Sequence, residues 1–459
     1  MAGFFHAWMA GLILSIEPNY PGLKRSWWPM LLLFLAANLY SIDKSIVGVL
    51  AEPISQDLAL NDVQMGLLLG LAYTVLNGIC GLWLGSLIDR HTRCKILGGA
   101  IILWSLATAA GGLAPDFKTF FALRALVGLG EAAVAPAAVS LIADMFSPQQ
   151  RGRAISTYLF GATIGTALSS IIPGFILDLN LHLSLPIYGL VTPWRVSFLI
   201  CGLVGPVVGI LFLTVREPAR RGQANADSGA MKVMNKLQFI WLHKKIFVPL
   251  LSGVCLFYIA FVAIASWMAT FIMRKFDIGL PAFANEMGLA LLISGALGYF
   301  SGGLAADSKF GRGARGKLTI MAILPVLAVP ATLAVVAPTP LVALVLLCTI
   351  MVVAPVLNVS LNTTVQDLLP NEMRGFTYAF ISVIAALPAG AGGPLAVAFV
   401  TEYVFQDQEA IGLSLLVVCL PALVLASLAF AMARRATAVT PKAAEEGEMA
   451  SMLVAPKPI

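Results

Sequence analysis

Long apolar runs recur along the whole chain, and each is close to the 20 residues with which an α-helix crosses the hydrocarbon core of a bilayer. Only 11% of the 459 residues are charged, whereas soluble globular proteins carry about 25%. The runs therefore predict an all-α, multi-pass membrane protein with almost no soluble domain. Twelve spans are expected, at Trp27–Ala51, Val63–Ile88, Cys94–Leu113, Thr119–Ala143, Ala154–Leu177, Trp194–Val215, Ile246–Met273, Phe283–Ala306, Leu318–Val336, Leu341–Val365, Phe376–Val400 and Ala410–Met432.

The longest polar stretch between spans divides the chain into two halves of six spans each. A short apolar helix at Phe4–Ile16 is expected to lie in the membrane interface. The predicted organisation is an interfacial segment at 1–26, a first bundle at 27–215, a linker with a basic amphipathic segment at 216–245, a second bundle at 246–433 and a disordered tail at 434–459.

Two polar motifs occur once in each half. The first is Gly85-Ser-Leu-Ile-Asp89-Arg90 after the second span, and Gly303-Leu-Ala-Ala-Asp307 after the eighth. The second runs from Asp144 to Arg151-Gly152 after the fourth span, and from Asp367 to Arg374-Gly375 after the tenth. The nearly equal separations indicate two parallel repeats, an arrangement in which transporters bind cargo at the midplane between the halves.

Basic residues are distributed unevenly between the two sides of the membrane. When the loops are placed by alternation, four of the 29 Lys and Arg fall outside and two lie within spans, Lys44 and Arg124. The external four are Lys118, Arg195, Arg274 and Lys275. The rest are cytoplasmic, so the positive-inside rule predicts that both termini are cytoplasmic. The formal charge of +6 thus needs no nucleic-acid partner.

Two acids, Asp43 and Glu131, lie inside predicted spans, and Arg124 shares a span with Glu131. An ionisable side chain at membrane depth costs roughly 2.5–3.5 kcal/mol on insertion scales. Such residues are rare and usually face a water-filled cavity, where they bind ions or substrate. The three residues therefore predict a proton-binding site beside a substrate path.

The spacing of Arg124 and Glu131 places them on one helix face, roughly 10.5 Å apart along the axis. That distance is too long for a direct ion pair, so Arg124 is expected to reach another helix, with Asp43 as its candidate partner. One interpretation is a structural pair that fastens the first and fourth spans together. The other is a functional site, in which protonation of the acid releases Arg124 to bind an anionic head group.

The loop Gly85-Ser-Leu-Ile-Asp89-Arg90-His-Thr-Arg93 resembles the signature loop of the major facilitator superfamily, with Thr92 where that motif usually has Gly. Further stretches of the first half resemble the Spinster branch, which transports sphingolipids and lysolipids. They are Asn38-Leu-Tyr40-Ser-Ile-Asp43-Lys44, Ala51-Glu52-Pro53-Ile54, Gln64-Met-Gly66-Leu-Leu, Arg124-Ala-Leu-Val-Gly-Leu-Gly-Glu131-Ala132, Ser140-Leu-Ile-Ala-Asp144 and Arg216-Glu-Pro218. Lys44 stands where the branch usually has Arg, which keeps the charge and loses the bidentate fork.

The resemblance implies twelve helices in two pseudo-symmetric six-helix bundles that work by alternating access, together with proton coupling at Asp43 and Glu131. It also implies a cytoplasmic latch. Asp89 is expected to face the N-terminal end of a neighbouring helix, where the macrodipole favours a carboxylate. Arg90 and Arg151 would complete this latch, and Asp307 and Arg374 would repeat it in the second half.

The second half offers neutral polar groups in place of charged ones. Asn358, Asn362 and Gln366 follow one another at i, i+4 and i+8 in the tenth span. Such a stripe is also explained by polar contacts between helices. A cavity with one charged wall and one neutral wall suits an amphiphile with a single charged end. The tyrosines expected along this path, each of which is also explained by packing, are Tyr40, Tyr73, Tyr158, Tyr258 and Tyr378. The predicted substrate-binding residues are Arg124, Tyr40, Asn358 and Asn362.

These patterns predict a proton-coupled carrier of a lysophospholipid or a sphingoid phosphate. A drug or organic-anion transporter of the same superfamily is the alternative, and a receptor that binds without moving cargo is another. An enzyme is not expected, because no GxSxG motif and no paired histidines occur. No cofactor is expected either, since the P-loop-like Gly311–Lys317 lacks the following Ser or Thr. We expect a monomer in a bacterial inner membrane.

Overall fold

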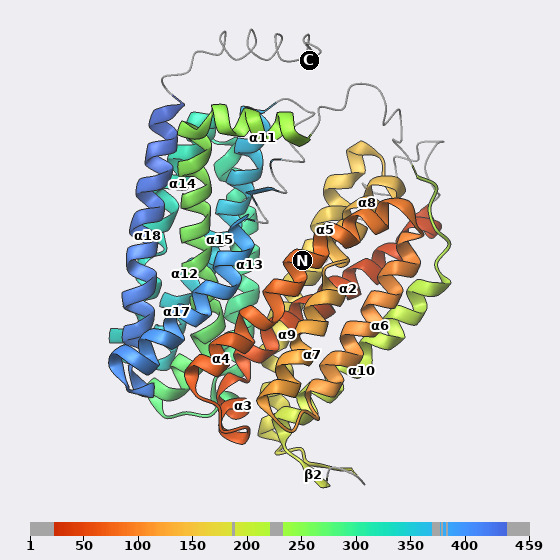
Figure 1. The fold of residues 1–459 in the computed structure, drawn as a ribbon, viewed down its shortest axis with the longest axis vertical. Helices are drawn as coiled ribbons and strands as arrows, with labels where there is room; N and C mark the ends of the chain where they lie inside the picture. The colour runs from red at the N-terminus through yellow and green to blue at the C-terminus, as the bar shows by residue number, and fades with distance from the viewer. Residues whose placement is uncertain are drawn as a thin grey trace, which may run out of the picture.

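The structure of the chain is a computed structural model that describes residues 23–185, 189–220, 233–369, 377, 380–381 and 384–437. Within these residues, twelve helical segments are long and apolar enough to cross a membrane, which confirms the predicted number of spans. They form two bundles that stand side by side, one from each half of the chain (Figure 1). The predicted helix at Phe4–Ile16, the linker residues 221–232 and most of the predicted tail lie outside the described residues.

The first bundle carries a small antiparallel hairpin at one end, in which Leu183 pairs with Val191. Its elements are α2 (Leu23–Val49), α3 (Ala51–Asp57), α4 (Asp62–Leu69), α5 (Leu71–Arg90), α6 (Arg93–Gly111), α7 (Phe117–Glu131), α8 (Val134–Met145), α9 (Pro148–Asp178), β1 (Leu183–Leu185), β2 (Gly189–Val191) and α10 (Pro193–Thr214).

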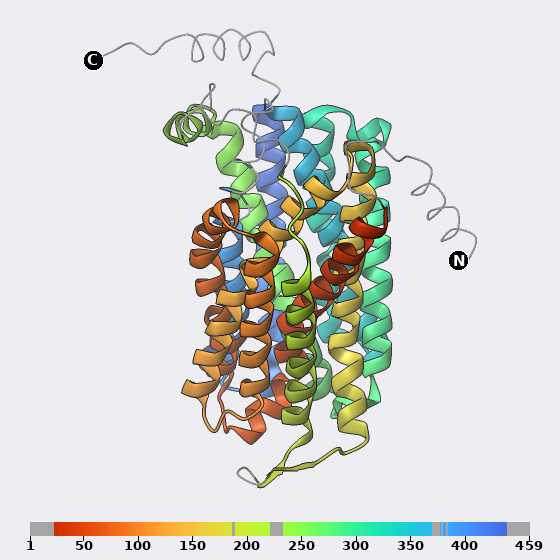
Figure 2. The same cartoon turned by 90° about the vertical axis from the view of Figure 1, so that its right-hand side faces the viewer.

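The second bundle begins with a helix that lies across the ends of its neighbours, α11, at the end of the molecule opposite the hairpin (Figures 1 and 2). Its elements are α11 (Val233–Leu242), α12 (Lys244–Phe276), η1 (Leu280–Ala282), α13 (Ala284–Asp307), η2 (Lys309–Gly311), α14 (Gly313–Leu327), η3 (Val329–Val336), α15 (Pro340–Leu368), η4 (Pro388–Gly392), α17 (Gly393–Phe399), η5 (Val400–Phe405), η6 (Gln408–Ala410) and α18 (Ile411–Ala436).

Several spans that the hydropathy pattern predicts as continuous helices are broken. The second span is interrupted at Gly70, between α4 and α5, and the fourth at 132–133, between α7 and α8. Pro136 explains the break in the fourth span, because it has no N–H to donate to the carbonyl of Ala132 one turn earlier. The eleventh span contains π-turns at η4 and η5. The break in the fourth span leaves Glu131 as the last residue of α7.

The internal repeat of the sequence is visible as two equivalent ion pairs. Arg93 at the start of α6 pairs with Asp144 of α8. At nearly the same positions of the second half, Lys317 of α14 pairs with Asp367 of α15, with Nζ and Oδ2 2.7 Å apart. Each pair ties the third helix of a bundle to its fourth, so the two halves share this contact as well as their topology.

The bundles touch through small residues at the end that carries α3 and α4. A Cβ added at Gly70 would lie 2.4 Å from the carbonyl oxygen of Gly390 in η4, which requires the two backbones to be in direct contact. Likewise, a Cβ at Gly48 would lie 2.9 Å from the carbonyl oxygen of Ser266 in α12. Close backbone approach of this kind is typical of small residues between membrane helices.

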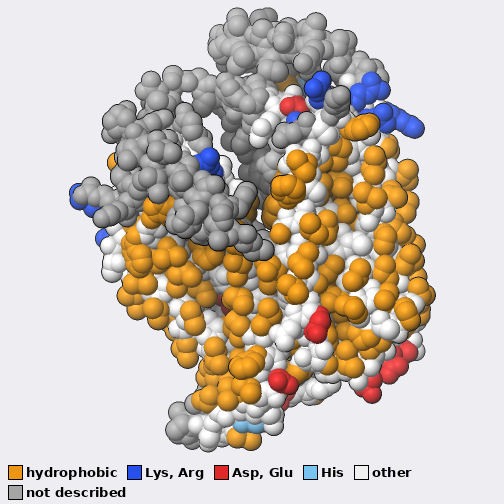
Figure 3. Space-filling view, turned by 180° about the vertical axis from the view of Figure 1, so that it is seen from behind, with side chains coloured by type: hydrophobic (Ala, Val, Ile, Leu, Met, Phe, Trp, Pro, Cys, Tyr) orange, Lys and Arg blue, Asp and Glu red, His pale blue; other side chains and the backbone are white. Residues whose placement is uncertain are grey.

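At the opposite end the two lobes separate. Figure 3 shows a hollow between them at the end that carries α11, and we call it the inter-bundle hollow. On the visible face, basic side chains gather at this end, while most of the acidic ones lie toward the other (Figure 3). Apolar side chains cover the surface between the two ends, as expected of a lipid-facing belt.

Candidate functional site

The three ionisable side chains that the sequence indicated within spans are buried inside the first bundle. Asp43 of α2, Arg124 of α7 and Glu131 at the end of α7 are 2%, 3% and 2% exposed. Arg124 reaches α2, as its spacing from Glu131 required. The acceptor, however, is the backbone carbonyl of Asp43, 3.1 Å from Nη1, and not the carboxylate. The guanidinium also lies over the ring of Tyr73 from α5, 5.7 Å from its centroid.

The two acids lie in different surroundings. The carboxylate of Asp43 faces Trp104 and Thr108 of α6, and the Cys201 thiol of α10 lies nearby, so it points into the bundle interior. Asp43 Oδ1 makes no hydrogen bond within the described part of the chain.

Glu131 faces Tyr73 and Lys44 in addition to Asp43 and Arg124. Neither of its carboxylate oxygens is hydrogen-bonded among the residues that the structure describes, although both are buried. A buried carboxylate without partners costs several kcal/mol if it is ionised. A packing role would not select such a residue, so the arrangement favours a site where a proton or a ligand satisfies Glu131.

Lys44 and Tyr40 connect this buried group to the inter-bundle hollow. Lys44 is exposed, and its ammonium group lies 5.8 Å from the centroid of the Tyr40 ring. It also faces Tyr299 of α13 in the other bundle. Because Lys44 is exposed and faces a residue of the second bundle, its side chain lies between the bundles. The Tyr40 hydroxyl is 3.4 Å from the hydroxyl of Tyr73.

The second bundle contributes a neutral polar group. Asn358 donates from Nδ2 to the hydroxyl of Tyr258 in α12 at 3.2 Å. Asn362, one turn later in α15, donates to the backbone and side-chain oxygens of Asn358, each at 3.0 Å. Two members of the predicted stripe thus form a hydrogen-bonded cluster with an aromatic hydroxyl, while the third, Gln366, is exposed. Asn358, Asn362 and Tyr258 are half-buried, and none of them carries a charge.

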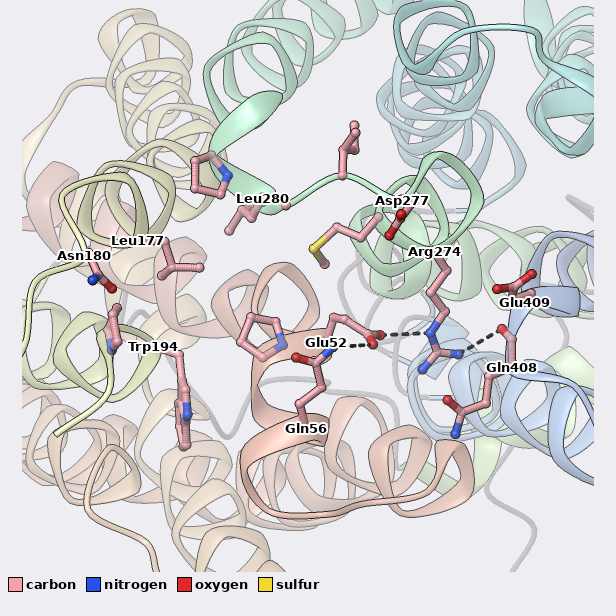
Figure 4. Close-up of a pocket in the computed structure, with 16 residues that line it drawn as sticks. Glu52, Gln56, Leu177, Asn180, Trp194, Arg274, Asp277, Leu280, Gln408 and Glu409 are labelled. Atoms are coloured by element: carbon pink, nitrogen blue, oxygen red, sulfur yellow. Dashed lines mark hydrogen bonds and ion pairs between the residues drawn. The ribbon is translucent and has the colours of Figure 1, made fainter. Parts of the chain in front are cut away.

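The end that carries α3 and α4, where the bundles touch, is called the closed end. It contains an ionic cluster that joins the bundles. Arg274, in the last turn of α12, forms a bidentate contact with Asp62 of α4, with Nη2–Oδ1 and Nη1–Oδ2 distances of 2.8 and 3.0 Å. Its Nε donates to Glu52 of α3 at 2.8 Å, and Nη1 donates to the carbonyl of Gln408 at 3.1 Å (Figure 4). The cluster borders a cavity of about 680 Å³. The loop pattern places Arg274 outside the membrane, and no motif of the sequence indicates a role for it.

At the end opposite α3 and α4, Arg93 ties three segments of the first bundle together. Besides Asp144, it contacts Glu217 after α10, with Nε and Oε1 2.7 Å apart. Burial opposes the ionised form of Glu217, but the hydrogen bonds from the Cys94 N–H and from Arg93 outweigh it and hold the pKa of Glu217 below its ordinary value. The signature motif contains Arg93, but its role in this cluster was not predicted.

The structure describes only part of the predicted latch. Arg151 donates to the carbonyls of Ala143 and Phe146 at 2.7 and 3.1 Å, so it caps the end of α8 within its own bundle. The side chains of Asp89, Arg90 and Asp307, and the whole of Arg374, lie outside the described residues. Because the lobes are apart at this end, a latch between them would form only in another conformation.

Comparisons with known proteins agree with this architecture. The sequence profile of the Major Facilitator Superfamily matches residues 33–394. An MFS-type efflux pump of Mycolicibacterium smegmatis is 26% identical over 86% of this chain and 89% of its own. Protein spinster of Drosophila melanogaster is 27% identical over 47% of this chain, and the matched region covers 34% of that protein. The fold is similar to the inward-facing, unoccupied crystal structure of a bacterial homologue of the human lysosomal transporter Spinster, with a TM-score of 0.74 and 22% identity over 91% of this chain and 98% of that one.

Proposed function

This chain belongs to the Major Facilitator Superfamily and is a Spinster-like multi-pass membrane transporter. From that premise, we propose that it is a proton-coupled carrier of an amphiphilic lipid, such as a lysophospholipid or a sphingoid phosphate. The observation that carries this proposal is the buried Glu131, whose two carboxylate oxygens have no partner among the described residues.

Proton coupling follows from the charges around Arg124. Two carboxylates, Asp43 and Glu131, flank a single guanidinium, and both are removed from solvent. Lys44 also faces Glu131 but is exposed, so if both acids were ionised, Arg124 would be the one buried cation beside two buried negative charges among these described residues, at a cost of several kcal/mol. A proton bound to one acid removes that cost. Deprotonation would return Arg124 to the acids, and protonation would free it for an anionic head group.

The nature of the cargo follows from the contrast between the two walls. In this proposal Lys44 and Tyr40, with Arg124 behind them, form the wall of the first bundle, and the hydrogen-bonded Asn358 and Asn362 form that of the second. One cationic wall and one neutral wall suit a molecule with a single anionic end and an apolar body. A dicarboxylate or sugar acid would require a second cationic wall.

A drug or organic-anion carrier is the second candidate function. The match to an efflux pump along 86% of this chain favours it, since that match covers both halves. Binding of a lysolipid and of a panel of amphipathic drugs and aromatic acids to the purified protein separates the two candidates. Selective lysolipid binding supports the first, and tight binding of the drugs or acids with none of the lysolipid refutes it.

Transport by the reconstituted protein tests the proton role. We expect labelled lysophosphatidylglycerol to cross the membrane faster under an imposed pH gradient, and Glu131→Gln to abolish that dependence. Glu286→Gln is the matched control, because Glu286 lies at the exposed start of α13. Undiminished proton-driven transport by Glu131→Gln would refute the assignment.

Orientation and gating complete the proposal. We infer a bacterial inner membrane with both termini in the cytoplasm, since basic side chains gather at the α11 end (Figure 3). The protein would act as a monomer, and Asp89, Arg90, Arg151, Asp307 and Arg374 would close the inner end in the outward-facing state. Labelling of a terminal tag in right-side-out and inverted vesicles tests the orientation.

A further inference from the structure

We propose that the Tyr73 hydroxyl is the positioning group that transmits the protonation state of Glu131 to Tyr40 and Lys44 in the inter-bundle hollow. This inference rests on the proposed function, because it takes Glu131 as the residue that carries the proton. It adds a residue that neither the motifs nor the spacing of charges indicated.

Tyr73 lies between the buried acid and the hollow. It is 7% exposed, and its ring packs under the Arg124 guanidinium. Its hydroxyl faces Glu131 on one side and is 3.4 Å from the Tyr40 hydroxyl on the other. Tyr40 in turn lies under the ammonium group of Lys44, which is exposed to the hollow.

A phenol has one O–H to donate, so the Tyr73 hydroxyl cannot serve both neighbours at once. An ionised carboxylate accepts a stronger and shorter hydrogen bond than a neutral hydroxyl does. In the structure the Tyr73 hydroxyl contacts Tyr40, and both Glu131 oxygens are without a partner among the described residues. A protonated Glu131 would leave the Tyr73 O–H to Tyr40 in this way, because a neutral carboxyl is a weaker acceptor than a carboxylate.

Loss of that proton would draw the Tyr73 hydroxyl to Glu131 and away from Tyr40. Tyr40 would then be free to turn, and the position of the Lys44 ammonium above its ring would change with it. An anionic head group near Lys44 therefore meets a different surface in the two protonation states, which is the differential interaction that coupling requires.

The other charged or titratable groups around this chain of contacts include Tyr299 of α13, which faces Lys44. Asp43 and Lys44 of α2 and Arg124 of α7 face Glu131, in addition to Tyr73 of α5. Tyr158 of α9 faces Tyr40 but is not among the groups that face Glu131. Tyr158 therefore provides a matched control that removes a hydroxyl beside Tyr40 and leaves the contact with Glu131 in place.

The test is the pH dependence of binding, measured with fluorescent lysophosphatidylglycerol and the full-length protein in detergent. Tyr73→Phe keeps the ring under Arg124 and removes only the hydroxyl. We expect it to reduce the change in Kd between low and high pH by about five-fold, the effect of one hydrogen bond. Tyr158→Phe is expected to keep the dependence of the unchanged protein.

The outcomes separate this inference from the proposed function. If Glu131→Gln leaves the pH dependence intact, the proton role of Glu131 is wrong. If Glu131→Gln removes the dependence and Tyr73→Phe does not, the proton role holds and the role of Tyr73 is overturned. If the probe does not bind, a second measurement is available. The infrared carboxyl band of Glu131, identified by its loss in Glu131→Gln, is followed in a pH titration. A band that Tyr73→Phe does not shift overturns the inference.

Discussion

Replacement of Arg274 by Gln should open the end of the molecule that the structure shows closed. Arg274 is the residue through which α12 of the second bundle holds Asp62 and Glu52 of the first. Its side chain is 8% exposed and that of Asp62 is 1% exposed, so the variant would leave a buried carboxylate without its partner.

The expected magnitude follows from that burial. Removal of one member of a buried ion pair costs about 3–5 kcal/mol. The Glu52 side chain is 18% exposed and regains some hydration, so we take about 3 kcal/mol, the lower end of the range. The cost falls only on the closed conformation, because the carboxylates are hydrated once this end opens. At 1.4 kcal/mol for each factor of ten, the ratio of open to closed molecules should rise about a hundred-fold.

Spin labels at Leu181 of the first bundle and Glu409 of the second would measure this change by double electron–electron resonance, with the half-buried native Cys80 and Cys255 replaced. We expect Arg274→Gln to add a longer-distance population. Arg195→Gln is the matched control, since Arg195 pairs with Asp57 at the same end but within the first bundle. Identical distance distributions for Arg274→Gln and the unchanged protein would refute the argument.

Three further predictions concern stability, measured by thermal unfolding in detergent. Gly165→Ala should cost about 1–3 kcal/mol, because its Cβ would lie 2.2 Å from a backbone oxygen of α2, while Gly99→Ala, with nothing within 4 Å, should be tolerated; equal losses would contradict this. Arg93→Met should lower the free energy of unfolding by about 3–5 kcal/mol, because the Arg93 cluster is buried. Lys317→Met should lower it by about 1 kcal/mol or less, because the Lys317 pair is partly exposed. A larger loss for Lys317→Met would show that burial does not decide the difference. The pKa of Glu217 lies below its ordinary value of 4.5, so its carboxylate stabilises the fold above about pH 4.5 and loses that effect as the pH falls through the lowered pKa. The loss of thermal stability caused by Glu217→Gln should therefore be largest at pH 7 and become smaller in acid. A loss of stability that became larger in acid would contradict the lowered pKa of Glu217.

The hydropathy pattern was sufficient to predict the twelve spans, because in lipid a span must satisfy its own backbone hydrogen bonds and so must be long and apolar. It did not predict where spans break. The interruption after Glu131 depends on Pro136, and the one at Gly70 occurs where the backbone of η4 lies against it. Both are local events inside runs that remain apolar.

The site was predicted in part for a similar reason. Acids at membrane depth are visible in a sequence, so Asp43 and Glu131 could be identified together with Arg124. Helical spacing says which face a residue occupies, but not which atom of a neighbour accepts its hydrogen bond, so the backbone acceptor of Arg124 could not be foreseen. Tyr73 was one of five tyrosines expected along the path, but nothing in the sequence marked it as the neighbour of Glu131, because an aromatic residue in a span usually serves packing.

The contact between Gly70 and Gly390 has a mechanical consequence. It divides the second span into two arms, about 12 Å from Asp62 to Gly70 and about 30 Å from Gly70 to Arg90, at 1.5 Å for each residue. Any rocking of the bundles about this point works as a lever, and the long arm travels about two and a half times as far as the short one. A shift of a few ångströms among the carboxylates at the end that carries α3 and α4 would then swing the opposite end wide, and probe pairs at both ends would report that ratio directly.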